Sequence, residues 1–214
     1  VALSGGRNGG GNILELGVGT GRLAIPLTEL GMRVTGVDSS AAMLERLRTK
    51  PGGERVTAVL GDMTDPPVPA KAFAVAFVAY NTLFNLVGPG QQQRCVTNTA
   101  SRLEPGGALV VEAYVPDPGG AASDVVTTRR VTANQVVLSV SRSDPDRQEV
   151  QGQYVDITEA GIKLRPWHIR WSTPEQLDAM AAEAGLRLED RWSDWAGTPF
   201  TDAAASHVSV YRAP

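Results

Sequence analysis

The chain has 214 residues, of which 42% are hydrophobic and 20% charged, a composition typical of one large globular domain and not of a disordered chain. Its net charge of -3 offers no electrostatic attraction to nucleic acid or to an anionic membrane, and no apolar run approaches the ~20 residues that span a bilayer. The single cysteine, Cys95, can form neither an internal disulfide nor a cysteine-based zinc site, which favours a cytoplasmic protein.

The N-terminal half alternates short apolar runs with helical patterns. Residues 1–11 are rich in glycine and predict a flexible linker or a truncated N-terminus. From Asn12 onward the alternation predicts an α/β fold with a doubly wound, Rossmann-like, mostly parallel sheet of seven strands. The predicted strands are Ile13–Leu16, Arg33–Val37, Arg55–Leu60, Ala72–Ala79, Ala108–Ala113, Leu186–Trp192 and His207–Tyr211. The predicted helices are Thr20–Leu30, Ala41–Thr49 with Ser39 as N-cap, Gln91–Leu103 with Pro105-Gly106-Gly107 as its stop, and one that begins at Pro174.

Residues 124–171 have a different character, because they show no helical period. Turn residues divide this stretch into four β-segments, which predicts an antiparallel meander. The segments are Val125–Val131, Gln135–Val140, Glu149–Ile157 and Ile162–Trp171. We therefore predict one main domain, formed by residues 12–123 and 172–214, with residues 124–171 inserted as a lid, an acceptor-binding subdomain or the surface of a homodimer.

The strongest chemical signal is the run Glu15-Leu16-Gly17-Val18-Gly19-Thr20-Gly21, which follows a predicted strand and opens a predicted helix. Glycines at such a place let the backbone turn sharply and approach a ligand. Asp38 ends the next predicted strand, where an acid accepts hydrogen bonds from ribose hydroxyls. The run also fits a dinucleotide fingerprint, so these residues leave both NAD and S-adenosylmethionine (SAM) open as ligands, beside a tight turn with no ligand at all.

Two further features favour SAM. Glu15 stands before the first glycine with one residue between them, and Asp62 and Met63 follow the third predicted strand, where an acid and an apolar side chain would meet an adenine ring. With these residues, the chain resembles the class I SAM-dependent methyltransferases. The stretches similar to the three SAM-binding motifs of that family are Glu15–Leu27, Val34–Met43 and Leu60–Met63.

A narrower resemblance concerns the run Ala79–Leu86, the turn at residues 105–107 and the ending His207–Tyr211. These segments are similar to actinobacterial small-molecule methyltransferases, some of which act in antibiotic and aminosugar pathways. The resemblance implies transfer of a methyl group from SAM to nitrogen or oxygen of a small molecule, such as a secondary metabolite. Such a transfer requires no metal, and the mild acidity of the chain gives no reason to expect nucleic acid or a membrane as partner.

The resemblance also implies roles for single residues. Gly17, Gly19 and Gly21 would line the methionine and ribose parts of SAM, and Asp38 would hold the ribose hydroxyls. Asp62 would accept a hydrogen bond from the adenine amino group, while Met63 would pack on the ring.

Two residues would serve the amino group of SAM. Glu15 would support the glycine loop or bind the amino group through water, and Ala79 would offer its backbone carbonyl.

Candidates for catalysis are Tyr80 and His168. Tyr80 follows the fourth predicted strand at the edge where ligands bind in such sheets, and its alternative role is an aromatic plug under the cofactor. His168 is a candidate base, because histidine titrates near neutral pH, although a packing histidine between Trp167 and Ile169 is the interpretation we favour. Glu112 is expected to be a paired structural carboxylate.

Two rival functions remain open at this point. An NAD(P)-dependent oxidoreductase would share the glycine loop and Asp38, but the chain lacks an evident Tyr-x-x-x-Lys pair. A non-catalytic SAM-binding domain would act through protein contacts instead.

Overall fold

In the computed structural model, which describes residues 11–117 and 119–214, the chain forms two compact units. The first unit comprises the chain up to Leu83 together with Pro89–Val115 and Pro174–Pro214. The second comprises Phe84–Gly88 and Pro116–Thr173, a wider span than the predicted insert. The predicted N-terminal linker lies outside the described residues, apart from Gly11. None of the described helices is long and apolar enough to cross a membrane.

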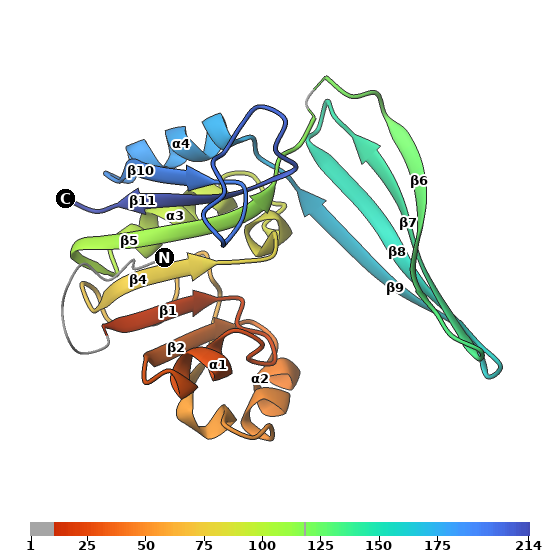
Figure 1. Ribbon diagram of the computed structural model, residues 1–214, viewed down its shortest axis with the longest axis horizontal. Coiled ribbons are helices and arrows are strands. Elements are labelled where there is room, and N and C mark those ends of the chain that lie inside the picture. Colours follow the sequence, from red (N-terminus) through yellow and green to blue (C-terminus); the bar gives the residue numbers. More distant parts are fainter. Residues whose placement is uncertain (1–10, 118) are drawn as a thin grey trace. The chain divides into compact units, whose positions relative to one another are not determined.

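A seven-stranded sheet forms the centre of the first unit, in the order β10-β11-β5-β4-β1-β2-β3 (Figure 1). Its strands are β1 (Asn12–Leu16), β2 (Arg33–Asp38), β3 (Thr57–Leu60), β4 (Phe73–Val78), β5 (Leu103–Tyr114), β10 (Arg187–Trp192) and β11 (Ser206–Arg212). β11 runs antiparallel to both of its neighbours, whereas the other adjacent strands are parallel. The predicted mostly parallel sheet of seven strands is therefore confirmed.

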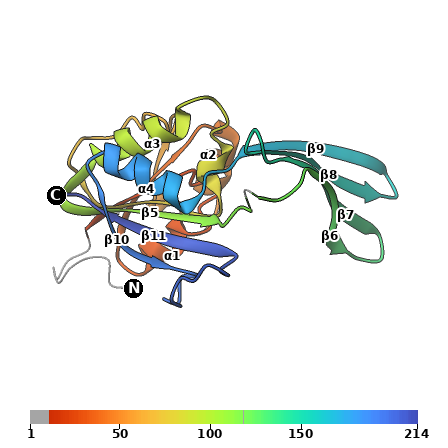
Figure 2. The ribbon, with the colours of Figure 1, turned by 90° about the horizontal axis from the view of Figure 1, so that it is seen from above.

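Helices cover both faces of this sheet. They are α1 (Ala24–Glu29), α2 (Ala41–Arg48), α3 (Gln91–Ala100) and α4 (Pro174–Glu183), with short 3-10 helices at Gly53–Arg55 and Thr82–Asn85. Figure 2 shows α3 and α4 on one face and α1 on the opposite face. On the α1 side, Ala24, Leu44 and Leu47 are buried in one apolar cluster, so α1 and α2 share a core.

Several predicted boundaries were wrong, and three of them concern helices. α1 begins only at Ala24, because residues 20–23 form turns, and Pro26 then lies in the first helical turn, where an N–H has no partner within the helix. The N-cap of α2 is Ser40, whose Oγ accepts a hydrogen bond from Met43 N at 3.3 Å. The turn predicted at residues 105–107 lies within β5, so α3 is shorter than its helical pattern suggested.

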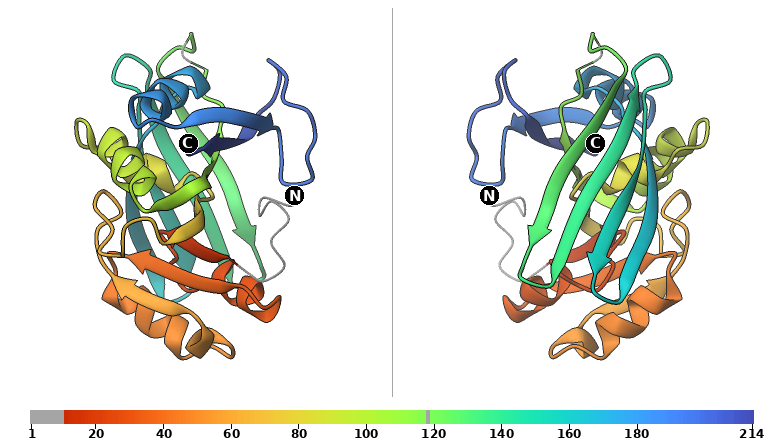
Figure 3. Two further views of the ribbon diagram at one scale, coloured as in Figure 1. Left: turned by 90° about the vertical axis from the view of Figure 1, so that its left-hand side faces the viewer. Right: turned by 90° about the vertical axis from the view of Figure 1, so that its right-hand side faces the viewer.

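The second unit is built on a four-stranded antiparallel sheet with the strands in chain order (Figure 3). Its strands are β6 (Ser123–Val131), β7 (Gln135–Asp144), β8 (Glu149–Thr158) and β9 (Gly161–Arg170). This sheet confirms the predicted meander. Gly152 of β8 is required by packing, because a Cβ at this position would lie 2.4 Å from an indole carbon of Trp167 on β9.

Candidate functional site

A cavity of about 370 Å³ lies in the first unit at the carboxyl ends of β1 and β4. These two strands are neighbours, but the chain continues from β1 to β2 on the other side of β1. The cavity therefore occupies the point at which the strand order reverses, where open α/β sheets bind their ligands. It is lined by Glu15, Leu16, Gly17, Val18, Gly19, Thr20, Arg22, Leu23, Met43, Ala79, Tyr80 and Thr82.

The structure brings together some of the residues that the sequence singled out. Those that line the cavity are Glu15, Gly17, Gly19, Ala79 and Tyr80. Those outside its lining are Gly21, Asp38, Asp62, Met63 and, in the second unit, His168.

The glycine loop, residues 17–21, lines part of the cavity, and its glycines are needed for different reasons. Gly17, Gly19 and Gly21 all have left-handed backbones, with φ of 73°, 55° and 77°. A Cβ on Gly17 would lie 2.3 Å from Thr82 Cγ2, so this glycine lets the loop pack against the turn that follows β4. A Cβ on Gly19 would meet no atom within 4 Å, so this glycine faces open space. Gly19 thus leaves room for a ligand, whereas Gly17 is needed for packing.

Asp38 holds the glycine loop from the end of β2. Its Oδ2 accepts a hydrogen bond from the backbone N–H of Gly19 at 2.8 Å, and its Oδ1 accepts one from that of Ser40 at 2.8 Å. A carboxylate has about four acceptor positions, so Asp38 retains capacity for ligand hydroxyls.

Glu15 places a buried carboxyl group against the cavity. Burial raises the pKa of this group to about 8, although the N–H of Ala24 and the charge of Arg22 act in the opposite direction. Its Oε2 has no hydrogen-bond partner among the described residues. A buried acceptor without a partner fits a cationic or hydrogen-bond-donating group of a ligand.

The turn after β4 contributes Ala79, Tyr80 and Thr82 to the wall of the cavity. Tyr80 is half exposed, and the guanidinium of Arg22 lies 3.7 Å from the centre of its ring, a cation–π contact. The carbonyl of Ala79, which we expected to face the amino group of SAM, accepts a hydrogen bond from Thr82 N at 3.1 Å and keeps a second lone pair. Sequence analysis gave Arg22 and Thr82 no role, although Arg22 directly follows Gly21 and Thr82 lies two residues after Tyr80; their positions beside predicted site residues were the available signal.

Asp62 and Met63 follow β3 at the same edge of the sheet. Asp62 is exposed, and its Oδ1 accepts a hydrogen bond from Thr64 N at 2.8 Å, while Met63 is half-buried. Their contacts with an adenine ring stay a prediction.

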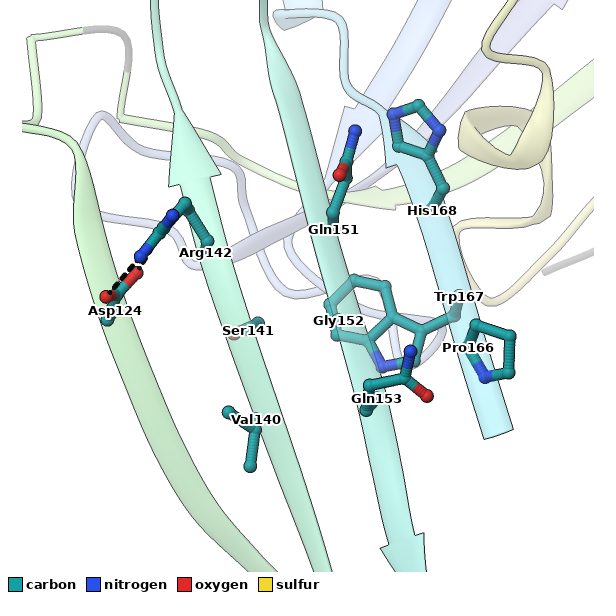
Figure 4. Close-up of a pocket in the computed structure, with 10 residues that line it drawn as sticks. All are labelled: Asp124, Val140, Ser141, Arg142, Gln151, Gly152, Gln153, Pro166, Trp167 and His168. Atoms are coloured by element: carbon teal, nitrogen blue, oxygen red, sulfur yellow. Dashed lines mark hydrogen bonds and ion pairs between the residues drawn. The ribbon is translucent and has the colours of Figure 1, made fainter. Parts of the chain in front are cut away.

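His168 lies in a second cavity, of about 700 Å³, within the second unit (Figure 4). Its Nε2 lies 3.2 Å from Oε2 of the buried Glu149, which also pairs with Arg147 at 3.4 Å. Figure 4 shows His168 beside Gln151, its partner in the sheet register. A carboxylate partner of this kind fixes the orientation of an imidazole ring. The role of His168 as a base stays a prediction.

In the described part of the chain, no group of three or more His, Cys, Asp or Glu side chains is placed to hold a metal ion.

The comparisons with known proteins agree with this geometry. Residues 13–107 match the family model of a methyltransferase domain. The CcbJ methyltransferase from Streptomyces caelestis is 39% identical with a TM-score of 0.88, and the match covers 94% of this chain and 83% of that one. The chain belongs to the class I SAM-dependent methyltransferases.

Two other proteins are also similar to this chain. The cypemycin N-terminal methyltransferase from Streptomyces sp is 29% identical over 198 residues, which are 90% of this chain and 79% of that protein. The SAM-bound structure of CalS10, an amino pentose methyltransferase from Micromonospora echinaspora, shares the fold with a TM-score of 0.71 at 22% identity, covering 95% of this chain and 84% of that one.

SAM is accordingly the cofactor of this methyltransferase, and NAD is not favoured. The cavity fits SAM in two respects that belong to this chain. Gly19 leaves open space beside the loop, and Glu15 offers a buried acceptor to an amino group.

Proposed function

We propose that this methyltransferase transfers the methyl group of SAM to an amine nitrogen of a small molecule, such as a secondary metabolite. The observation that carries the proposal is that the wall of the cofactor cavity has Glu15, Arg22 and Tyr80 as its ionisable side chains among the described residues, whereas the candidate base His168 belongs to the second unit. A neutral amine needs no general base, whereas a hydroxyl does. The relatives named above as N-terminal and amino pentose methyltransferases support an amine acceptor.

The bound cofactor supplies a methyl group already activated by its sulfonium. The task of the protein is then to hold donor and acceptor in line and to exclude water. In this proposal the glycine loop and Asp38 bind the ribose and methionine parts of SAM, and Glu15 accepts a hydrogen bond from the amino group. Asp62 and Met63 receive the adenine, and Tyr80 closes the wall beside the reacting groups.

The second unit is proposed to bind the acceptor. Its cavity is lined by the Asp124–Arg142 pair, by His168 and by Pro166, so it offers polar groups beside an apolar surface. Sites for small molecules commonly show such a combination. The expected homodimer stays a prediction.

Matched pairs of acceptors test the amine assignment. The purified chain is incubated with SAM and an amino sugar or a peptide with a free N-terminus, each beside its hydroxyl or N-acetyl analogue. S-adenosylhomocysteine (SAH) formation and the gain of one methyl group by mass are measured. We expect product with the free amines only. Equal methylation of the hydroxyl analogues would overturn the assignment.

A second candidate, transfer to a hydroxyl, rests on the Glu149–His168 pair as a base. The pH profile separates the two. For an amine acceptor, kcat/KM increases with pH as the acceptor loses its own proton, and the variant His168→Ala shows the same increase. For a hydroxyl acceptor, His168→Ala abolishes the increase of kcat/KM with pH and lowers kcat by about 100-fold. Tyr80→Phe, beside Tyr80→Ala, shows in the same assay whether the phenol or only the ring is needed.

A further inference from the structure

The turn that follows β4 has an unusual backbone. Tyr80 and Asn81 are consecutive, and both have left-handed conformations, with φ of 54° and 61°. Residues with a Cβ rarely adopt this region, and a bulky residue such as tyrosine does so least readily. Such a conformation persists only where surrounding contacts impose it, and it is frequent at ligand sites.

The contacts that impose it come from β5. The backbone N–H of Tyr80 donates to Oε2 of Glu112 at 2.9 Å, and the N–H of Asn81 donates to the carbonyl oxygen of Glu112 at 3.2 Å. The side-chain oxygen of Asn81 accepts from the N–H of Tyr114 at 2.7 Å. Glu112 thus engages both left-handed residues, one with its carboxylate and the other with its main chain.

This turn is also the wall of the cofactor cavity. Ala79, Tyr80 and Thr82 line the cavity, and Thr82 is the residue against which Gly17 of the glycine loop packs. The ring of Tyr80 lies under Arg22, which follows the same loop. The backbone conformation of Tyr80 therefore sets the position of its ring, of the Ala79 carbonyl and of the contact with the loop.

We infer that Glu112 is a positioning residue for cofactor binding: through the N–H of Tyr80, its carboxylate holds the left-handed turn in the form that completes the cavity wall. Glu112 is not part of the cavity lining, so it acts through Tyr80 and does not touch the ligand. Without this acceptor the turn relaxes towards an ordinary backbone, and the ring of Tyr80 leaves Arg22.

The test measures the Kd of SAH by calorimetry and hydrogen exchange of the amides of Tyr80 and Asn81. Glu112→Ala is expected to raise the Kd at least about fivefold and to accelerate exchange at Tyr80, because its amide loses its acceptor. Glu112→Gln keeps an oxygen at that place and is expected to stay within about twofold of the wild type. Glu104→Ala, on the same strand but away from the turn, is the matched control and leaves both readouts unchanged.

A double-mutant cycle separates positioning from a general structural role. If Glu112 acts by placing the ring of Tyr80, then Glu112→Ala raises the Kd by a smaller factor in a Tyr80→Ala background than in the wild type, because the ring is already absent while the backbone N–H of residue 80 remains. An additive effect, or equal Kd values for the wild type and Glu112→Ala, would overturn the inference. If Glu112→Ala fails to fold, Glu112→Asp replaces it: its carboxylate is withdrawn by one methylene, so a raised Kd supports the inference and an unchanged Kd contradicts it.

Discussion

The carboxylate of Asp38 accepts a hydrogen bond from the backbone N–H of Gly19 at 2.8 Å, which ties the end of β2 to the glycine loop. Asp38→Ala leaves this N–H and that of Ser40 without their acceptor. We expect the Kd of SAH to rise at least tenfold, and the free energy of unfolding to fall by about 1–2 kcal/mol. Calorimetry and urea unfolding measure the two effects. Asp38→Asn retains one acceptor oxygen, so its losses of SAH affinity and of stability should be smaller. An unchanged Kd in Asp38→Ala would exclude this residue from the binding site.

Gly19 and Gly31 form a matched pair that separates strain from ligand contact. Both have positive φ, 55° and 83°, and a Cβ on either would meet no atom within 4 Å. Alanine at each position should therefore cost a similar ~1 kcal/mol of stability from backbone strain. Only Gly19 lines the cavity, so only Gly19→Ala is expected to weaken SAH binding, by tenfold or more by calorimetry. An equal loss of affinity in Gly31→Ala would show that strain alone is responsible.

The pKa of Glu15, raised to about 8 by burial, predicts proton release on cofactor binding. At neutral pH the carboxyl is mostly protonated, and the amino cation of SAH beside it lowers its pKa, so it ionises. We expect release of up to about one proton at pH 7, and much less in Glu15→Gln. Titrations in buffers with different ionisation enthalpies measure this number. The same proton count in the wild type and the variant would show that Glu15 does not meet the amino group.

Because of the buried side chain of His207, we expect the folded protein to lose stability in mild acid. Burial, with a smaller contribution from the charge of Arg191, lowers its pKa from 6.5 to about 4. The unfolded chain therefore binds a proton at a pH where the folded chain does not. The contribution of His207 to stability is complete above pH 6.5 and is lost as the pH falls towards 4, by an amount on the order of 3 kcal/mol.

Unfolding in urea at a series of pH values tests this expectation. The variant His207→Leu removes the titrating group and should flatten the curve between pH 6.5 and 4. A free energy of unfolding that does not decline between pH 6.5 and 4 in the wild type would contradict this prediction.

The elements of the first unit were predictable where their signals are local. β4 and the stretch Ala108–Val111 of β5 are continuous apolar runs, because both faces of the sheet are buried there. α4 begins at Pro174, as expected, since proline fits the first turn of a helix. The start of α1 was wrong, because the glycine loop continues as turns up to Leu23 in order to surround the cavity.

The sequence by itself determined the fold class, the glycine loop and the position of Asp38, because these depend on apolar periodicity and on residues close together in the chain. It also led to the family, which the comparisons confirm. Only the tertiary structure decided that Glu112 holds Tyr80, 32 residues away, and that Arg22 covers the ring. Such contacts depend on which strands become neighbours and on a left-handed backbone at two residues with side chains, and no local propensity encodes either.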